Sequence, residues 1–142
     1  MTQRINRGNI ARTANYLVGT GMNRSDAFKA AWLMAKRGGV TKATGVTYSN
    51  RQNLIARLAT YDPALIRIVL QQDKSNLFDP QAVAIVASVS GKGSATIGFI
   101  PAITARTLSK LMDKGTAFKA SLDRIVGGYQ GLSYGVRLRV AI

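Results

Sequence analysis

The chain has 142 residues, with 20 lysines and arginines against 6 acidic residues, and therefore a formal net charge of +14. It contains no cysteine and no histidine, which excludes disulfides and thiolate metal sites and removes the commonest general base and metal ligand. No apolar run approaches the ~18 residues of a membrane span, and the first residues lack the apolar core of a secretory signal. We therefore expect a cytoplasmic protein with no membrane partner, cofactor or metal, whose basic charge favours a nucleic-acid partner.

Residues 1–40 form a basic N-terminal extension in which one helix is predicted, over about residues 26–37. Ser25 is suited to cap this helix, and the pair Gly38–Gly39 is suited to end it. The first dozen residues are expected to be mobile. The extension would contact phosphates through its cations, which are Arg4, Arg7, Arg12, Arg24, Lys29, Lys36 and Arg37.

An apolar stripe on this predicted helix carries the tryptophan of the chain. Phe28, Trp32 and Ala35 are spaced to share one face, with Ala31 beside them. This stripe would dock the helix on the rest of the protein. Alternatively, Trp32 would anchor a protein partner.

Residues 41–142 are predicted to form one β-rich domain. Apolar and β-branched runs predict six strands, over residues 40–48, 65–71, 82–88, 95–100, 116–126 and 133–142. Two helices are expected, over residues 51–58 and 102–113. The fold class is therefore mainly β with flanking helices, and we expect a small OB-like β-barrel plus the N-terminal helix.

Two of these elements have faces that the sequence defines. In the helix over 102–113, the residues spaced to point inward are Ile103, Leu108, Leu111 and Met112. In the last strand, apolar residues alternate with Arg137 and Arg139. One face of that strand should therefore be buried and the other solvated and basic.

Three short motifs in the second part occur in a recognisable order. They are Gly45-Val46-Thr47-Tyr48, the loop segment Asn76 to Val83 with its Phe78-Asp79 pair, and Gly98-Phe99-Ile100-Pro101 before a helix. In this order they resemble the HIRAN family, over roughly residues 41–142. The resemblance implies a small β-barrel related to OB-folds that binds single-stranded DNA and can hold a 3′ end.

The family's end-binding pocket maps by position onto Thr47-Tyr48, Phe78-Asp79 and Phe99. Thr47 stands where the family has a phosphate-binding arginine, Phe78 lacks a hydroxyl, and Phe99 cannot donate a hydrogen bond. Aromatic stacking on bases survives these changes, because it needs only a π-face. We therefore expect single-strand binding without recognition of a free 3′-hydroxyl.

The candidate nucleic-acid-binding residues combine aromatic rings with cations. Two alternatives stay open at this point: Asp79 would only organise its loop, and Phe78 and Phe99 would belong to the core. Tyr48 is the preferred base-stacking residue. The full set is Tyr48, Arg51, Lys74, Phe78, Asp79, Phe99, Arg106, Arg137 and Arg139.

The function predicted from these residues is non-catalytic binding of nucleic acid, DNA before RNA. No catalytic residue is predicted, because the aspartates are scattered and histidine is absent. One alternative is a phage or mobile-element protein that binds and inhibits a host nucleoprotein, such as a CRISPR or restriction effector. A second is an accessory to a metal-dependent nuclease, for which only Asp73 and Asp79 are close enough in sequence to share a magnesium ion.

Overall fold

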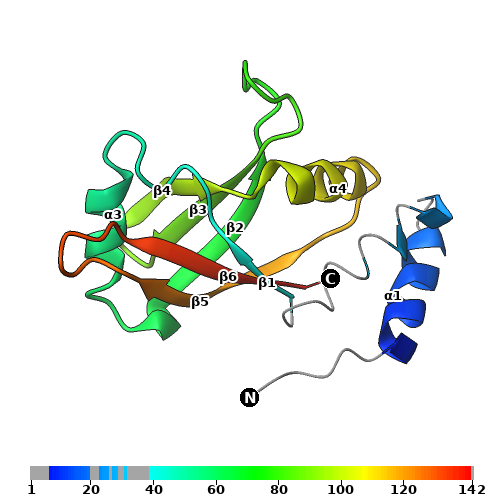
Figure 1. The fold of residues 1–142 in the computed structure, drawn as a ribbon, viewed down its shortest axis with the longest axis horizontal. Helices are drawn as coiled ribbons and strands as arrows, with labels where there is room; N and C mark the ends of the chain where they lie inside the picture. The colour runs from blue at the N-terminus through cyan, green and yellow to red at the C-terminus, as the bar shows by residue number, and fades with distance from the viewer. Residues whose placement is uncertain (1–6, 20–22, 26, 29–30, 32–38, 142) are drawn as a thin grey trace.

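The computed structural model describes residues 7–19, 23–25, 27, 28, 31 and 39–141 (Figure 1). A six-stranded antiparallel sheet forms its centre, in the order β1-β6-β5-β2-β3-β4. The elements are α1 Arg7–Gly19, β1 Val40–Lys42, α3 Arg51–Leu58, the 3-10 turn η2 Pro63–Leu65, β2 Ile66–Gln72, β3 Val83–Val89, β4 Gly93–Phe99, α4 Ala102–Asp113, β5 Lys119–Val126 and β6 Gly135–Ala141. The mainly β fold with flanking helices is thus confirmed.

The sheet is not closed into a barrel, which corrects the OB-like expectation. β1 pairs with β6 over only three residues, and the chain then turns at Gly45, whose φ is +67°. Between the two sheet edges, the described residues make a single isolated bridge, Thr44 with Phe99. The Thr44 amide donates to Phe99 O at 2.8 Å, and the Phe99 amide donates to Thr44 O at 2.9 Å. The early turn at Gly45 stops this bridge from growing into a ladder.

The core lies between one face of the sheet and the two helices α3 and α4. Ile55 and Leu58 of α3, and Ala105 and Leu108 of α4, are buried against strand residues. On the sheet side, the buried residues of this core are Ile68, Val83, Ile85, Ala87, Ile97, Val136 and Leu138. This packing fixes α3 over β4, and therefore fixes the loop that precedes α3.

The prediction that Ile103 faces inward was wrong, because its side chain is 82% exposed. The buried face of α4 is set by Ala105, Leu108 and Leu111, each three residues from the next. A residue two positions before Ala105 is turned by about 200° around a helix of 3.6 residues per turn, so it points to solvent.

The N-terminal extension contains a helix that the sequence patterns did not predict. α1 begins within the first dozen residues, which were expected to be mobile, and beyond that dozen its Ala14 and Leu17 are fully buried. They pack with Ala27, Ala31 and Leu111 in a second core cluster, so the extension docks on α4. The apolar face of α1 is short and its partners are mostly alanines, so it gives only a weak pattern in the sequence. Packing against α4 stabilises the helix more than its own apolar residues would predict.

The helix predicted over 26–37 can be compared only at its beginning. Arg24 and Ser25 are already helical, and the Ala27 amide donates to Asn23 O at 2.9 Å, so Ser25 does not cap the helix. Phe28, placed in the docking stripe, is 39% exposed, while the alanines beside it are buried. Trp32 and residues 33–37 lie outside the described residues.

None of the helices in the described ranges is long and apolar enough to cross a membrane.

Candidate nucleic-acid interface

Three of the sequence-predicted residues meet at the start of α3. The guanidinium carbon of Arg51 lies 5.1 Å from the centre of the Tyr48 ring and 5.1 Å from that of the Phe99 ring. Arg51 also donates from Nη1 to Gly45 O at 2.8 Å, which ties the guanidinium to the loop. Both ring distances are within the range of a cation–π contact. The Tyr48 ring is 70% exposed, so one of its faces remains available to a ligand.

Two structural features hold the loop over residues 43–50 to the sheet. Gly98 allows the close approach, because a Cβ there would lie 2.9 Å from Thr44 O. Gln52, which the sequence patterns did not single out, donates from Nε2 to Val46 O at 2.9 Å and to Tyr134 O at 3.0 Å. It also accepts from the Tyr134 amide at 2.8 Å. Tyr48 is therefore presented by a loop fixed at both ends.

The loop between β2 and β3 forms a second projecting feature. Asn76 Oδ1 accepts from the amides of Phe78 and Asp79, at 2.9 and 3.0 Å. Asp79 Oδ1 accepts from the Gln81 amide at 2.9 Å, and Asp73 accepts from Ser75 Oγ at 3.0 Å and from Asn76 Nδ2 at 3.3 Å. Asp79 therefore accepts a backbone hydrogen bond within its own loop, as the loop-organising alternative requires.

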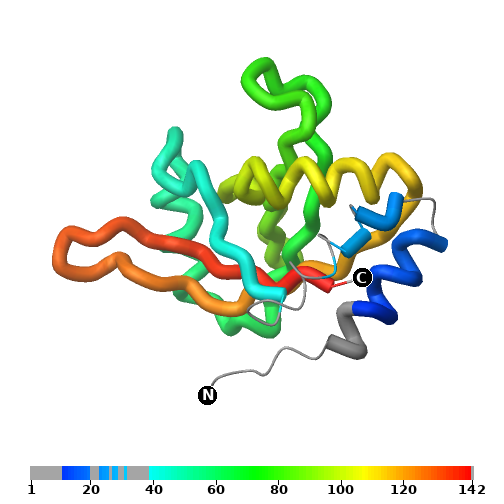
Figure 2. Tube along the Cα trace, turned by 45° about the vertical axis from the view of Figure 1, so that its right-hand side comes forward, coloured from blue at the N-terminus to red at the C-terminus, as the bar shows by residue number. Residues whose placement is uncertain are grey.

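The tip of this second loop is apolar. Leu77 is 95% exposed and Phe78 is 99% exposed, so Phe78 does not belong to the core. Figure 2 shows the loop (green) and the loop over 43–50 (cyan) projecting toward the same end of the molecule as separate features. The rings of Tyr48 and Phe99 are joined through Arg51, whereas Phe78 stands on its own loop.

A row of cations crosses three strands on the solvated face of the sheet. Lys42 of β1 is the register partner of Arg137 of β6, and Arg137 is also the register partner of Arg124 of β5. Lys42 and Arg137 are partners in a regular ladder, where such residues share one face with Cβ atoms about 4.5–5.5 Å apart. Arg124 follows a register shift between Leu122 and Arg124, so its pairing with Arg137 lies at a β-bulge. The face is the one opposite the buried Val136 and Leu138, as the sequence predicted for Arg137.

One carboxylate offsets part of the charge of this face. Asp123 accepts from Arg139 Nη2 at 3.2 Å and lies 3.9 Å from Arg124 Nε. Arg139 is therefore largely occupied by this carboxylate. Arg137 Nε is buried and has no hydrogen-bond acceptor among the described residues. Lys42 and Arg124 were missed from sequence, because strand register cannot be counted along one chain.

The remaining predicted cations lie elsewhere. Lys74 pairs with Asp113 at 3.2 Å. The hydrogen bond that Gln72 donates to Asp113, and then that from Lys74, lower the pKa of this carboxyl below its ordinary value. Arg106 is exposed on α4, apart from the row.

The cations of the N-terminal extension are only partly described. Arg12 and Arg24 are exposed. Arg7 is described only through its place at the start of α1. Arg4, Lys29, Lys36 and Arg37 lie outside the described residues.

Asp73 and Asp79, the pair considered for a shared magnesium ion, both have hydrogen-bond partners in the structure. Their carboxylates accept hydrogen bonds from within their own loop. Among the residues that the structure describes, no three carboxylate, histidine or cysteine side chains converge as metal ligands.

No model of a known protein family and no curated protein matches the chain. A protein from Lactobacillus plantarum, whose crystal structure was determined by the Northeast Structural Genomics Consortium, is similar in structure. It is 17% identical, the match covers 73% of this chain and 93% of that chain, and the TM-score is 0.49.

Proposed function

We propose that this protein binds nucleic acid without catalysing a reaction, and that single strands lie along the basic face of its sheet. The observation that carries the proposal is the register of Lys42, Arg137 and Arg124 across β1, β6 and β5. Like charges placed directly opposite one another in a sheet are destabilising. A polyanion would relieve this repulsion, because phosphates would lie between the cations.

A preference for single strands is supported by the exposed Tyr48 ring. Bases of a single strand have free faces, and stacking one of them on an aromatic side chain typically contributes about 1–3 kcal/mol. Arg51 and its bond to Gly45 hold this ring in place before any ligand binds, which lowers the entropic cost of stacking. The backbone of the strand would then be held by charge and a base by the ring.

The resemblance to the HIRAN family agrees with this proposal in its motifs. Tyr48 and Phe99 occupy family pocket positions and meet at Arg51. Phe78 occupies another and stands on a separate loop tip. DNA is preferred over RNA on the resemblance alone, since charge and stacking do not read the 2′-hydroxyl. Such a partner is consistent with the cytoplasmic location that the sequence predicts.

A second candidate function is binding to a nucleoprotein, which is the mobile-element alternative. It is favoured by Leu77 and Phe78, which are 95% and 99% exposed on a loop tip that is internally hydrogen-bonded. Exposed apolar side chains on an ordered loop are typical of contacts with a protein partner. In this case the basic face would contact the nucleic-acid component, such as a guide RNA, and the tip would contact the protein.

One isolation experiment tests both functions. The protein is purified from cells under native conditions, and the bound material is examined before and after nuclease treatment. Nucleic acid that is removed by nuclease or by high salt supports the first function. A protein that stays bound after nuclease, and is lost from the double variant Leu77→Ser/Phe78→Ser, supports the second. Neither function survives if only the protein itself is recovered and an added oligonucleotide does not bind at low salt.

A further inference from the structure

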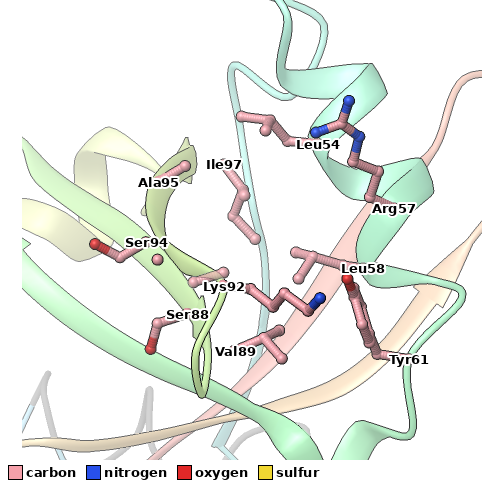
Figure 3. Close-up of a pocket in the computed structure, with 12 residues that line it drawn as sticks. Leu54, Arg57, Leu58, Tyr61, Ser88, Val89, Lys92, Ser94, Ala95 and Ile97 are labelled. Carbon is pink, nitrogen blue, oxygen red and sulfur yellow. The ribbon is translucent and has the colours of Figure 1, made fainter.

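A cleft of about 280 Å³ lies between α3 and the hairpin of β3 and β4 (Figure 3). It is on the helix-covered side of the sheet, because the buried Ala87 and Ile97 contribute to its lining. The cation row lies on the opposite, solvated face. The cleft also lies toward the C-terminal half of α3, whereas Arg51 and Tyr48 are at its beginning. It is therefore distinct from the candidate nucleic-acid interface.

We propose that this cleft is a binding site for a small organic anion, a phosphate monoester or carboxylate carried on one apolar ring. The polar part of the argument is its charge. Arg57 from α3 and Lys92 from the β3–β4 turn both line the cleft, and no carboxylate does so among the described lining residues. Neither cation has an ion-pair partner within the described part of the chain.

Lys92 and Tyr61 converge from the two sides of the cleft, whereas the Arg57 guanidinium lies at its Leu54 end (Figure 3). In Figure 3, Lys92 extends from the hairpin toward Leu58 and Tyr61 on the helical side, and the Tyr61 hydroxyl points toward the same space. An ammonium group and a phenolic hydroxyl can both donate to an anionic oxygen. Hydrogen bonds that involve a charged partner are about twice as strong as neutral ones. The head group of the ligand would thus sit near Lys92 and Tyr61.

The floor of the cleft accounts for the apolar part of the ligand. Leu54, Leu58 and Ile97 line it beside the cations (Figure 3). Small-molecule sites typically combine an apolar lining with a few polar groups that fix orientation, in volumes of about 300–1,000 Å³. At about 280 Å³, this cleft is slightly smaller than the lower end of that range. It suits one ring with one anionic group better than a longer molecule.

The test uses phenyl phosphate as the probe, titrated into the full chain by calorimetry and by amide chemical-shift changes. Inorganic phosphate and benzyl alcohol are the comparison compounds, since each lacks one half of the proposed ligand. Lys92→Gln removes one cation from the cleft. Lys119→Gln is the matched control, because Lys119 is an exposed cation on β5 that does not line the cleft.

We expect one phenyl phosphate to bind per chain, with shifts concentrated around α3 and the β3–β4 turn. Lys92→Gln should weaken binding by about tenfold or more, as expected for one lost charge-assisted hydrogen bond, and Lys119→Gln should leave it unchanged. Inorganic phosphate and benzyl alcohol should each bind at least about tenfold more weakly. Arg57→Gln is a second, independent variant that should also weaken the binding of phenyl phosphate.

Three outcomes would overturn the proposal. One is an equal loss of phenyl phosphate affinity in Lys92→Gln and Lys119→Gln, which would mean that the probe is attracted by the overall positive charge of the protein. Another is binding of inorganic phosphate as tight as that of phenyl phosphate, which would remove the role of the apolar floor. The third is the absence of shifts around the cleft at millimolar probe. None of these results depends on whether the protein binds nucleic acid.

Discussion

Arg51 and Tyr48 form a preassembled pair, with the guanidinium carbon 5.1 Å from the centre of the tyrosine ring. The arginine is the first residue of α3 and also binds the carbonyl of Gly45, so helix, loop and ring are positioned together. A half-buried ring, that of Phe99, lies at the same distance from the guanidinium. The contacts of Arg51 therefore orient the Tyr48 ring without covering its exposed surface.

Replacing Tyr48 should therefore affect binding rather than stability. Tyr48→Ala is expected to weaken binding of a single-stranded oligonucleotide by about 1–3 kcal/mol, the usual loss for one stacked base. The midpoint of thermal unfolding should hardly change, because 70% of the side chain is already exposed. Tyr129→Ala is a matched control, since Tyr129 is 62% exposed in the turn between β5 and β6. Equal losses of affinity in the two variants would contradict a specific role for Tyr48.

Gly98 is predicted to be essential for the attachment of the Tyr48 loop. In Gly98→Ala, the new Cβ would lie 2.9 Å from Thr44 O and 3.2 Å from Val46 Cγ1, so the bridge between Thr44 and Phe99 must shift. Overpacking of this kind typically costs about 1–3 kcal/mol, which urea unfolding would measure. Gly19→Ala is the control, because a Cβ at that position would have no described atom within 4 Å. If Gly98→Ala is as stable as Gly19→Ala, the backbone around Thr44 adjusts to the new Cβ at little cost in free energy.

Asp79 should be important for stability, whereas Phe78 should not. Asp79→Ala removes the acceptor for the Gln81 amide and is expected to lower the free energy of unfolding by about 1 kcal/mol. Phe78→Ser should leave it unchanged, since the ring is 99% exposed. Chemical denaturation of the two variants beside the original chain is the measurement. If Asp79→Ala is as stable as Phe78→Ser, the hydrogen bonds of Asn76 and Asp73 organise the loop without Asp79.

Recognition of a 3′ end is predicted to be absent. Thr47 is exposed but lacks the guanidinium that the resemblance to the HIRAN family would place there, and Phe78 stands on the separate loop tip. Oligonucleotides that end in a 3′-hydroxyl or a 3′-phosphate should therefore displace a labelled strand equally well. A preference beyond about tenfold, equivalent to some 1.4 kcal/mol, would show that other residues complete an end pocket.

Much of the fold follows from the sequence because its elements have strong local signals. The helix over 102–113 is preceded by Pro101 and followed by Gly115, and the structure places α4 at Ala102–Asp113. The helix at Arg51–Leu58 and five of the strands likewise agree with the predicted ranges to within a few residues. The strand expected over 40–48 is shorter, since Gly45 turns the chain after β1.

The candidate site could be predicted only in part. Tyr48, Arg51 and Phe99 were identified individually, and their meeting depends on the bridge between Thr44 and Phe99. This bridge joins residues 55 positions apart, and no local pattern indicates it. The cation row was missed for the same reason, because register between β1, β6 and β5 is set by tertiary packing. The sheet also stays open because the chain turns at Gly45 after β1. The effect of this turn on strand pairing cannot be predicted from the composition.

The salt dependence of single-strand binding tests the central claim most directly. If the row of Lys42, Arg137 and Arg124 contacts phosphates, the double variant Lys42→Gln/Arg124→Gln should lose two of those contacts. The log–log slope of affinity against salt should then be shallower by about 1.4, at about 0.7 per phosphate. The free energy of unfolding should change little, because removal of like charges beside Arg137 is offset by loss of the ion pair between Arg124 and Asp123. The double variant Lys114→Gln/Lys119→Gln, of equal charge, should keep most of the original slope. Identical slopes for both double variants would contradict the account, since binding would then depend on total charge and not on the row.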